Sequence, residues 1–221
     1  MDSRVFVEDV ESDIQCRLRN LTLIKTIPSR YGLRPDDINA WIRCSFPIIY
    51  AEWEGFFVNT ATLYIRQINS LNLHLTQIGK HYIVRDVEKK FKQINNNYPQ
   101  KIDARHRFIS GFMDYCRNDV VDMSTEINTE SNLGFQEMNG ILDSLNLPMV
   151  PDHISGAAYS LKDDLNRFLL DTRNGIAHGN LTRTISSEDI SKAINLVERL
   201  MEIIKERFKE GLENEVFLIH N

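Results

Sequence analysis

The feature that most constrains the fold is a stripe of apolar residues recurring every three or four positions over about seven helical turns. The stripe consists of Ile38, Ile42, Phe46, Ile49, Trp53, Phe56, Thr60 and Leu63. It predicts one long helix over residues 36–69, with one face against a core. Pro47 is expected to kink this helix, because proline has no N–H to bond the carbonyl of Arg43.

The rest of the chain repeats this helical pattern in shorter pieces and contains no alternating run long enough for a substantial sheet. An N-terminal helix is expected to end near Thr26, before Pro28 and Gly32. A third helix is predicted over residues 81–94. Its inward positions are Ile83, Val87, Phe91 and Ile94. Further helices are predicted within 105–123 and over 135–145, with the polar span 122–132 as a loop before the latter.

Two helices near the C-terminus show the pattern most clearly. The first is expected to begin near Ser155 and the second at Ser186, where Asp189 is typical of a capping arrangement. The first buries Ala158, Leu161, Leu165, Phe168, Thr172 and Ile176, and the second Ile190, Ile194, Val197, Met201, Ile204 and Phe208. The second should end near Gly211. Together they predict an antiparallel hairpin, after which Val216–Ile219 could form a strand or a terminal arm.

These elements predict an all-α fold, an up-and-down helical bundle with extra N-terminal and middle helices in one domain, 1–221. The expected parts are front helices in 1–121, a loop and short helix in 122–152, a back hairpin in 153–211 and a C-terminal arm in 212–221.

Composition bounds the class of protein. A hydrophobic fraction of 42% and a charged fraction of 26% are ordinary for a soluble globular chain. No segment approaches the ~20 apolar residues that span a bilayer, and the N-terminus opens no signal peptide, so a cytoplasmic protein without a membrane partner is expected. Cys16, Cys44 and Cys116 lack the paired spacing of a zinc site and are expected to be buried thiols, so no metal is implied.

The segment most informative about chemistry lies where the first back helix is expected to end. Arg173, Asn174 and His178 stand there within about two helical turns. A guanidinium can hold a phosphate through a fork of donors, and an imidazole titrates near neutral pH. The trio therefore suits proton transfer beside a phosphodiester, as in RNA cleavage. Such a spacing occurs about once by chance in this composition, so the interpretation depends on context, including the space left by Gly175 and Gly179.

In this context the segment Arg173–His178 resembles the motif of the HEPN superfamily, small helical domains many of which are metal-independent RNases of toxin–antitoxin and anti-phage systems. Tyr50–Phe56 and Ile127–Leu133 also resemble a stand-alone branch of that superfamily. The resemblance implies a four-helix core, a homodimer whose two motifs face one cleft, and endonucleolytic cutting of an RNA substrate without a cofactor.

The spacing of the motif bears on whether one chain suffices. In an unbroken helix Arg173 and His178 would lie about 140° apart around the axis. Either the backbone bends at Gly175 or Gly179, or the phosphate sits between two copies of the motif, as the implied homodimer would allow. In the resulting hypothesis His178 takes the proton of the ribose 2′-hydroxyl, Arg173 holds the non-bridging oxygens, and Asn174 orients the ring or the phosphate.

Three carboxylates are candidates for supporting these groups. Glu52 and Glu54 flank Trp53 on the long helix, and one of them could pair with Arg173 or tune His178. The alternative is that both are partly exposed carboxylates beside a core tryptophan. Asp171 is a further candidate.

The charge distribution suggests where RNA would lie. A net charge of −5 argues against holding nucleic acid by bulk electrostatics. The stretch Lys80–Arg107, however, carries eight Lys or Arg against three acids, a local balance of +5. The candidate RNA-binding residues in it are Lys89, Lys90, Lys92, Arg105 and Arg107. The alternative is an ordinary solvated face.

Two other functions remain open. One is a non-catalytic HEPN-like module for dimerisation, partner binding or RNA holding. The other is a toxin controlled by an antitoxin or defence-system partner protein, including one silenced covalently by a nucleotidyltransferase. In the resembling toxins of that last kind a Tyr stands two residues after the His, whereas here Asn180 occupies that place.

Overall fold

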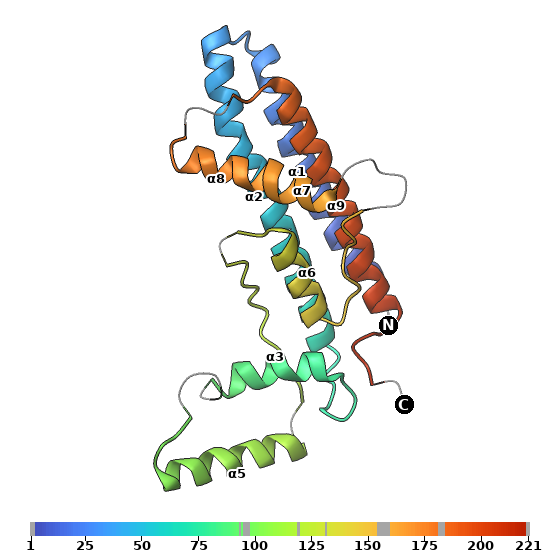
Figure 1. Ribbon diagram of the computed structural model, residues 1–221. Coiled ribbons are helices and arrows are strands. Elements are labelled where there is room, and N and C mark those ends of the chain that lie inside the picture. The colour runs from blue at the N-terminus through green and yellow to red at the C-terminus, as the bar shows by residue number, and fades with distance from the viewer. Residues whose placement is uncertain are drawn as a thin grey trace.

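Three long helices form the body of the molecule in this computed structural model, which describes residues 3–92, 94, 98–118, 120–130, 132–153, 160–180 and 184–219. They are α1 (Arg4–Arg30), α2 (Pro35–Asn69) and α9 (Ser187–Glu213). α1 runs antiparallel to α2, and α9 runs in the same direction as α2 (Figure 1). The described residues contain helices and two isolated β-bridges but no strand, so the predicted all-α fold is confirmed.

The predicted apolar stripe of α2 forms much of the core. From Ile42 to Thr60 its members are buried, while Ile38 and Leu63 are partly buried. α2 contacts both α1 and α9. Aromatic side chains join these helices, since Phe208 of α9 packs edge-on against Phe57 and Tyr64 of α2, with ring centroids 6.2 and 5.1 Å away.

Pro28 does not end the first helix, so the predicted boundary near Thr26 is wrong. α1 continues to Arg30 with Pro28 inside its last turns. A proline cannot bond the carbonyl four residues earlier, here that of Ile24. The indole Nε1 of Trp41 on α2 donates to that carbonyl at 3.0 Å, which satisfies it. This hydrogen bond links the end of α1 to the start of α2.

Three shorter helices follow α2 in the chain: α3 (Lys80–Lys90), α5 (Ile102–Asn118) and α6 (Phe135–Ser144). α3 ends at Lys90, and Ile94 is 43% exposed, so the prediction of a helix to Ile94 with that residue inward is wrong. The buried positions of α3 are Tyr82 and Asp86. This face is buried although it includes a carboxylate, because Asp86 accepts a hydrogen bond from the Tyr115 hydroxyl at 2.7 Å.

The helix that carries the motif is continuous through α7 (Leu161–Asp163), a π-helical segment η1 (Asp164–Leu170) and α8 (Asp171–Ala177). It begins at Leu161, after Ser160 accepts a hydrogen bond from the Asp163 N–H at 3.0 Å. The predicted start near Ser155 is therefore wrong, and Ser155 and Ala158 lie outside the described residues.

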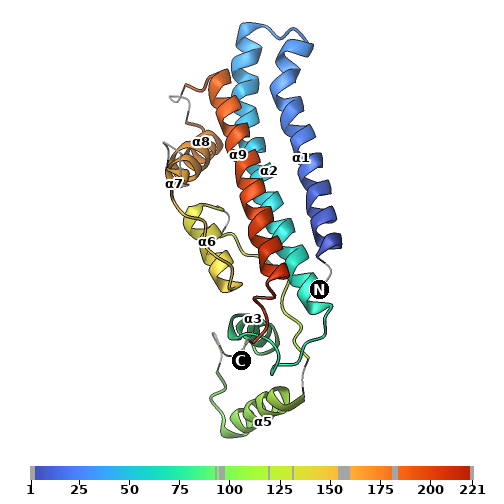
Figure 2. The same ribbon diagram turned by 90° about the vertical axis from the view of Figure 1, so that its right-hand side faces the viewer.

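This helix lies across α2 and α9 instead of alongside α9 (Figure 1), and it is seen nearly end-on in Figure 2. The predicted antiparallel hairpin is therefore wrong. Leu161, Leu165 and Leu169 are buried, and the last two lie in the π-helical segment. The predicted inward residue Phe168 is only partly buried and packs edge-on against Phe46, with centroids 5.6 Å apart.

α9 begins with the predicted capping arrangement. Ser186 accepts from the Asp189 N–H at 3.1 Å, and the Asp189 carboxylate accepts from the Ser186 N–H at 2.9 Å. The helix passes through Gly211 to Glu213, so Gly211 is not its end. A Cβ at Gly211 would stand 2.3 Å from Leu147 Cδ2, so close packing explains the glycine. The C-terminal arm then forms a bridge between Leu218 and Ile78.

The prediction that the three cysteines are buried is wrong. Cys16, Cys44 and Cys116 are exposed free thiols, not buried ones. Two of them lie on solvent-facing sides of α1 and α2, whose buried faces are already filled by larger apolar and aromatic side chains. Separately, none of the helices in the described ranges is long and apolar enough to cross a membrane.

Candidate active site

Arg173 is the third residue of α8 and is held in one orientation by three contacts. Its guanidinium lies over the ring of Tyr50, with the central carbon 4.7 Å from the ring centroid. Its Nη1 donates to Oδ1 of Asn132 at 3.1 Å and to Oδ1 of Asn174 at 2.7 Å. Nη2 and Nε make no hydrogen bond with a described residue.

Tyr50 supplies the surface on which Arg173 stacks, and its own position is fixed. It is 1% exposed, and its hydroxyl oxygen accepts a hydrogen bond from the Leu133 N–H at 2.6 Å. Burial, and after it the negative charge of Glu54, raises the pKa of Tyr50 to about 12. The phenol therefore stays neutral near pH 7, and the cation beside it faces an uncharged ring.

The segment after the middle loop is tied to the same helix. Glu54 accepts a hydrogen bond from the Thr129 hydroxyl at 2.8 Å, and Trp53 donates to the Leu133 carbonyl at 3.4 Å. The two segments that resemble the HEPN branch thus meet at Arg173. Tyr50 and Asn132 are functional candidates that were not predicted as site residues, since their only signal was membership in those segments.

His178 has a different environment. It is the C-cap of α8, with φ −88° and ψ 12°, and its side chain is exposed. Its backbone N–H bonds the Asn174 carbonyl at 2.9 Å, so the helix runs unbroken through Gly175. The imidazole makes no hydrogen bond or ion pair with a described residue. Arg173 is therefore turned towards α2, while His178 is open to solvent.

The chain bends directly after His178. Gly179 has φ +76°, and its N–H bonds the Ile176 carbonyl at 3.0 Å, while the Asn180 N–H bonds the Gly175 carbonyl at 2.8 Å. These two hydrogen bonds and the left-handed glycine form a Schellman motif that ends α8. Arg43 of α2 donates to the Asn180 carbonyl at 2.5 Å, and this bond holds the turn against the bundle.

The other predicted supporting residues lie elsewhere. Glu52 points to α1, where its carboxylate accepts from Arg17 Nη1 at 3.0 Å and from Asn20 at 2.9 Å. Gly55 makes room for this pair, because a Cβ there would stand 2.8 Å from Arg17 Nη1. Asp171 is exposed and makes no contact of this kind with a described residue. In the described part of the chain no three His, Cys, Asp or Glu side chains gather as metal ligands.

Comparison with known proteins identifies the family. The model of the family described as RiboL-PSP-HEPN matches residues 9–210. The chain belongs to this HEPN family. Membership suggests a role as a nuclease or in RNA binding. The curated proteins and the solved structures that were compared with this HEPN chain gave no match.

The basic stretch of this HEPN protein is partly committed to internal contacts. Lys89 pairs with Asp122 at 2.6 Å, and Lys90 pairs with Asp86 at 3.3 Å. Arg105 donates to the Pro99 carbonyl at 2.8 Å. The exposed side chains of Lys92 and Arg107 form no ion pair with a described residue. Lys89 and Lys92 line a hollow of about 690 Å³ between α3, the loop 124–129 and Ile141 of α6.

Proposed function

We propose that this HEPN protein is a metal-independent endoribonuclease, acting as a toxin or anti-phage defence effector. His178, with a neutral ring, takes the proton from a ribose 2′-hydroxyl. Arg173 holds the non-bridging phosphate oxygens while charge develops on the phosphorane, and Asn174 orients the phosphate. The products are a 2′,3′-cyclic phosphate and a 5′-hydroxyl.

The observation that carries this proposal is the contrast between the two main residues. Arg173 is pre-organised by Tyr50, Asn132 and Asn174, and its Nη2 and Nε have no hydrogen-bond partner in the described part of the chain. The imidazole of His178 is exposed and is likewise unpaired among described residues. Attack of a ribose hydroxyl on a phosphodiester needs a positioned cation to hold the phosphate and an accessible general base to take the proton. Family membership is consistent with this chemistry.

The same contrast supports a composite site in a homodimer. Because α8 is unbroken through Gly175, Arg173 and His178 leave the helix on different sides. A twofold contact would place the motif of each protomer opposite the other, so that His178 of one chain serves the phosphate held by Arg173 of its partner.

Cleavage of mixed RNA in the presence of EDTA tests the chemistry. We expect wild-type protein to cut and to leave cyclic phosphate ends, and His178→Ala to cut at least ~100-fold more slowly. Arg173→Ala should lose a similar factor. His74→Ala, at an exposed histidine at the other end of α2, is the matched control and should remain active. Full activity of a folded His178→Ala protein would contradict the assignment.

Mixing the two inactive variants tests the composite site. A heterodimer of Arg173→Ala and His178→Ala contains one intact Arg and one intact His on different chains. If the groups act in trans, subunit exchange should restore part of the cleavage. If activity stays absent while mixed dimers form, both groups must come from one chain.

The alternative is a non-catalytic HEPN module that binds RNA or a partner such as an antitoxin. The observation that favours it is that the contacts of Arg173 with Tyr50 and Asn132 are also structural ones, because they join α8 to α2 and to the loop before α6. Under this alternative the wild-type protein retains RNA in a filter-binding assay but yields no cyclic phosphate ends, and Arg173→Ala lowers stability instead of activity.

A further inference from the structure

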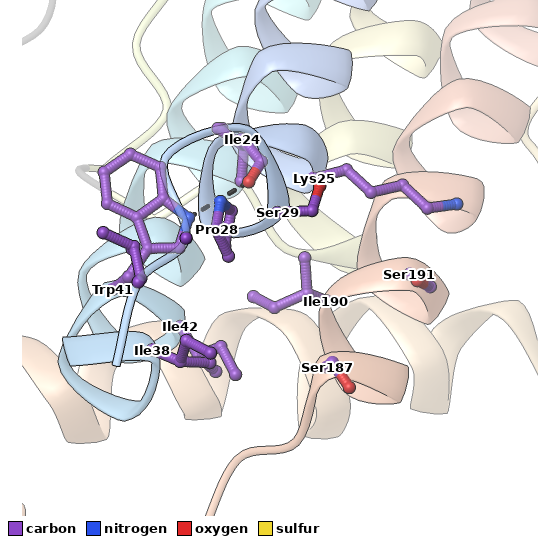
Figure 3. A pocket seen from close by; sticks show the side chains of 12 residues that line it. Ile24, Lys25, Pro28, Ser29, Ile38, Trp41, Ile42, Ser187, Ile190 and Ser191 are labelled. Atoms are coloured by element: carbon purple, nitrogen blue, oxygen red, sulfur yellow. Dashed lines mark hydrogen bonds between the residues drawn. The ribbon is translucent and has the colours of Figure 1, made fainter. Parts of the chain in front are cut away.

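An apolar cavity lies at the end of the bundle where α1 meets α2. We call it the terminal cup, and its volume is about 580 Å³. Its apolar wall is formed by Ile24, Pro28, Leu33, Ile38, Trp41, Ile42 and Ile190. Leu33 lies in the connection between α1 and α2, and the other side chains come from the last turns of α1, the first turns of α2 and the first turn of α9. The labelled ones surround an open space in Figure 3.

The cup exists because the three helices end at different levels. α1 and α2 extend beyond the start of α9 at Ser187 (Figure 1), so the inner faces at their joined end have no third helix over them. The hydrogen bond from Trp41 Nε1 to the Ile24 carbonyl fixes one wall (Figure 3). Because that bond uses the indole donor, the interior offers no free side-chain donor and suits an apolar group.

The rim has a different character. Lys25, Ser29, Ser187 and Ser191 border the opening. The Lys25 side chain is exposed and forms no ion pair with a described residue. The two serines of α9 stand in its first turns, where the capping box and the acidic side chains Glu188 and Asp189 already complement the positive end of the helix. Lys25 is therefore the group at the opening that favours an anion. The cup thus combines an apolar interior with an exposed cation at its edge.

The size of the cup limits what can fill it. It spans about two helical turns, or roughly 11 Å, along α1 and α2. That is shorter than the groove in which an amphipathic helix docks through several successive turns. The volume falls within the range of roughly 300–1,000 Å³ typical of small-molecule sites. Charge complementarity with Lys25 selects an anionic head over a neutral or cationic one.

We propose that the terminal cup binds a small amphipathic anion, with an alkyl chain or fused aromatic rings inside and a carboxylate or sulfonate at Lys25. This site is separate from the proposed RNase site, because the cup contains none of the residues 173–178. Its success or failure is therefore independent of whether the protein cleaves RNA.

Titration with the fluorescent probe 8-anilinonaphthalene-1-sulfonate tests the proposal on the full-length protein. We expect saturable binding at one site per chain, with displacement by decanoate and weaker displacement by 1-decanol. Lys25→Gln should weaken probe binding roughly two- to fivefold, as the loss of an exposed charge pair predicts. Ser191→Phe should abolish the saturable phase by filling the cup. Lys101→Gln, at an exposed lysine at the start of α5, is the matched control and should bind as wild type does.

Three results would overturn the proposal. The first is that the wild-type protein does not bind the probe saturably. The second is that decanoate and decanol displace the probe equally well and that Lys25→Gln binds it as tightly as wild type. The third is a concentration-dependent dimer that Ser191→Phe dissociates, since a second copy would then fill the cup. Circular dichroism establishes that Ser191→Phe folds, and if it does not, the exposed Lys25→Gln variant and the alkyl pair decide the question.

Discussion

The orientation of a single guanidinium sets what the candidate site can do. Arginine has a fork of donors, and its use depends on which donors the protein already occupies. In this HEPN chain Asn132 and Asn174 both accept from Nη1, and the ring of Tyr50 covers one face of the group. The conformational freedom of Arg173 is therefore already reduced before a phosphate arrives.

A double-mutant cycle on the free energy of unfolding should detect this stacking as a coupling energy between Tyr50 and Arg173. We expect Tyr50→Leu and Arg173→Met, made singly and together, to show a coupling of about 1 kcal/mol, because a partly desolvated cation lies on the ring. Urea unfolding followed by circular dichroism measures it. Tyr50→Leu with Arg66→Met is the control cycle, since Arg66 is exposed about four turns further along α2. A Tyr50–Arg173 coupling no larger than that of the control would show that the stack does not stabilise the fold.

Among the elements, the helix formed by α7, η1 and α8 has the greatest influence on the site. Its π turns shift the inward register so that Leu169 is buried. Asn166 lies in these π turns, and its side chain points to the start of α6. Its Oδ1 accepts a hydrogen bond from the Phe135 N–H at 2.8 Å. Gly134 permits this approach, because a Cβ there would stand 3.0 Å from that oxygen. One helix thus caps another and positions the loop that carries Asn132.

Removing this cap should destabilise the protein. Asn166→Ala leaves the Phe135 N–H without its acceptor, and we expect a loss of about 1–3 kcal/mol in the free energy of unfolding. Asn166→Asp retains the acceptor and adds a negative charge near a helix N-terminus, so it should retain most of the stability. Asn195→Ala, at an exposed position of α9, is the control and should change little. Equal stability of Asn166→Ala and wild type would mean that solvent replaces the cap at no cost.

Across the whole molecule, three buried phenols connect the bundle to the smaller helices. Tyr50 bonds the loop before α6. Tyr64 of α2 donates to the hydroxyl of Tyr82 of α3 over 3.0 Å, and Tyr82 in turn donates to the Leu145 carbonyl at the end of α6. Burial raises the pKa of each phenol, to about 12 for Tyr50 and well above the usual value for Tyr64 and Tyr82. The fold therefore depends on these groups remaining protonated.

Stability should consequently fall at alkaline pH. The unfolded chain loses the Tyr50 proton near the ordinary pKa of 10.0, while the folded chain keeps it to about 12. The contribution of this group is complete below the unfolded pKa and is lost as pH rises through the folded one, a change of about 3 kcal/mol. Urea unfolding across the alkaline range measures it, and Tyr50→Phe should reduce the loss. Tyr31→Phe, at a 74% exposed side chain, should leave it unchanged. A pH profile of Tyr50→Phe identical to that of wild type would contradict this account.

Local rules were sufficient for much of the fold. The apolar stripe of α2 and the capping box at Ser186 each depend on residues within a few turns of one another, and both were confirmed. The same rules failed at Gly211 and Phe168. There the deciding contacts come from Leu147 in a distant loop and from a π turn that shifts the register.

By itself, then, the sequence determined where most helices form and that Arg173, Asn174 and His178 belong to one short segment, because periodicity and caps act over short stretches of chain. Only the tertiary structure decided that Tyr50 lies beneath Arg173, that Asn132 holds it, and that α8 crosses the bundle instead of running beside α9. The physical reason is that these contacts join residues 41 or more positions apart, where side-chain packing and burial select one arrangement that no local pattern encodes.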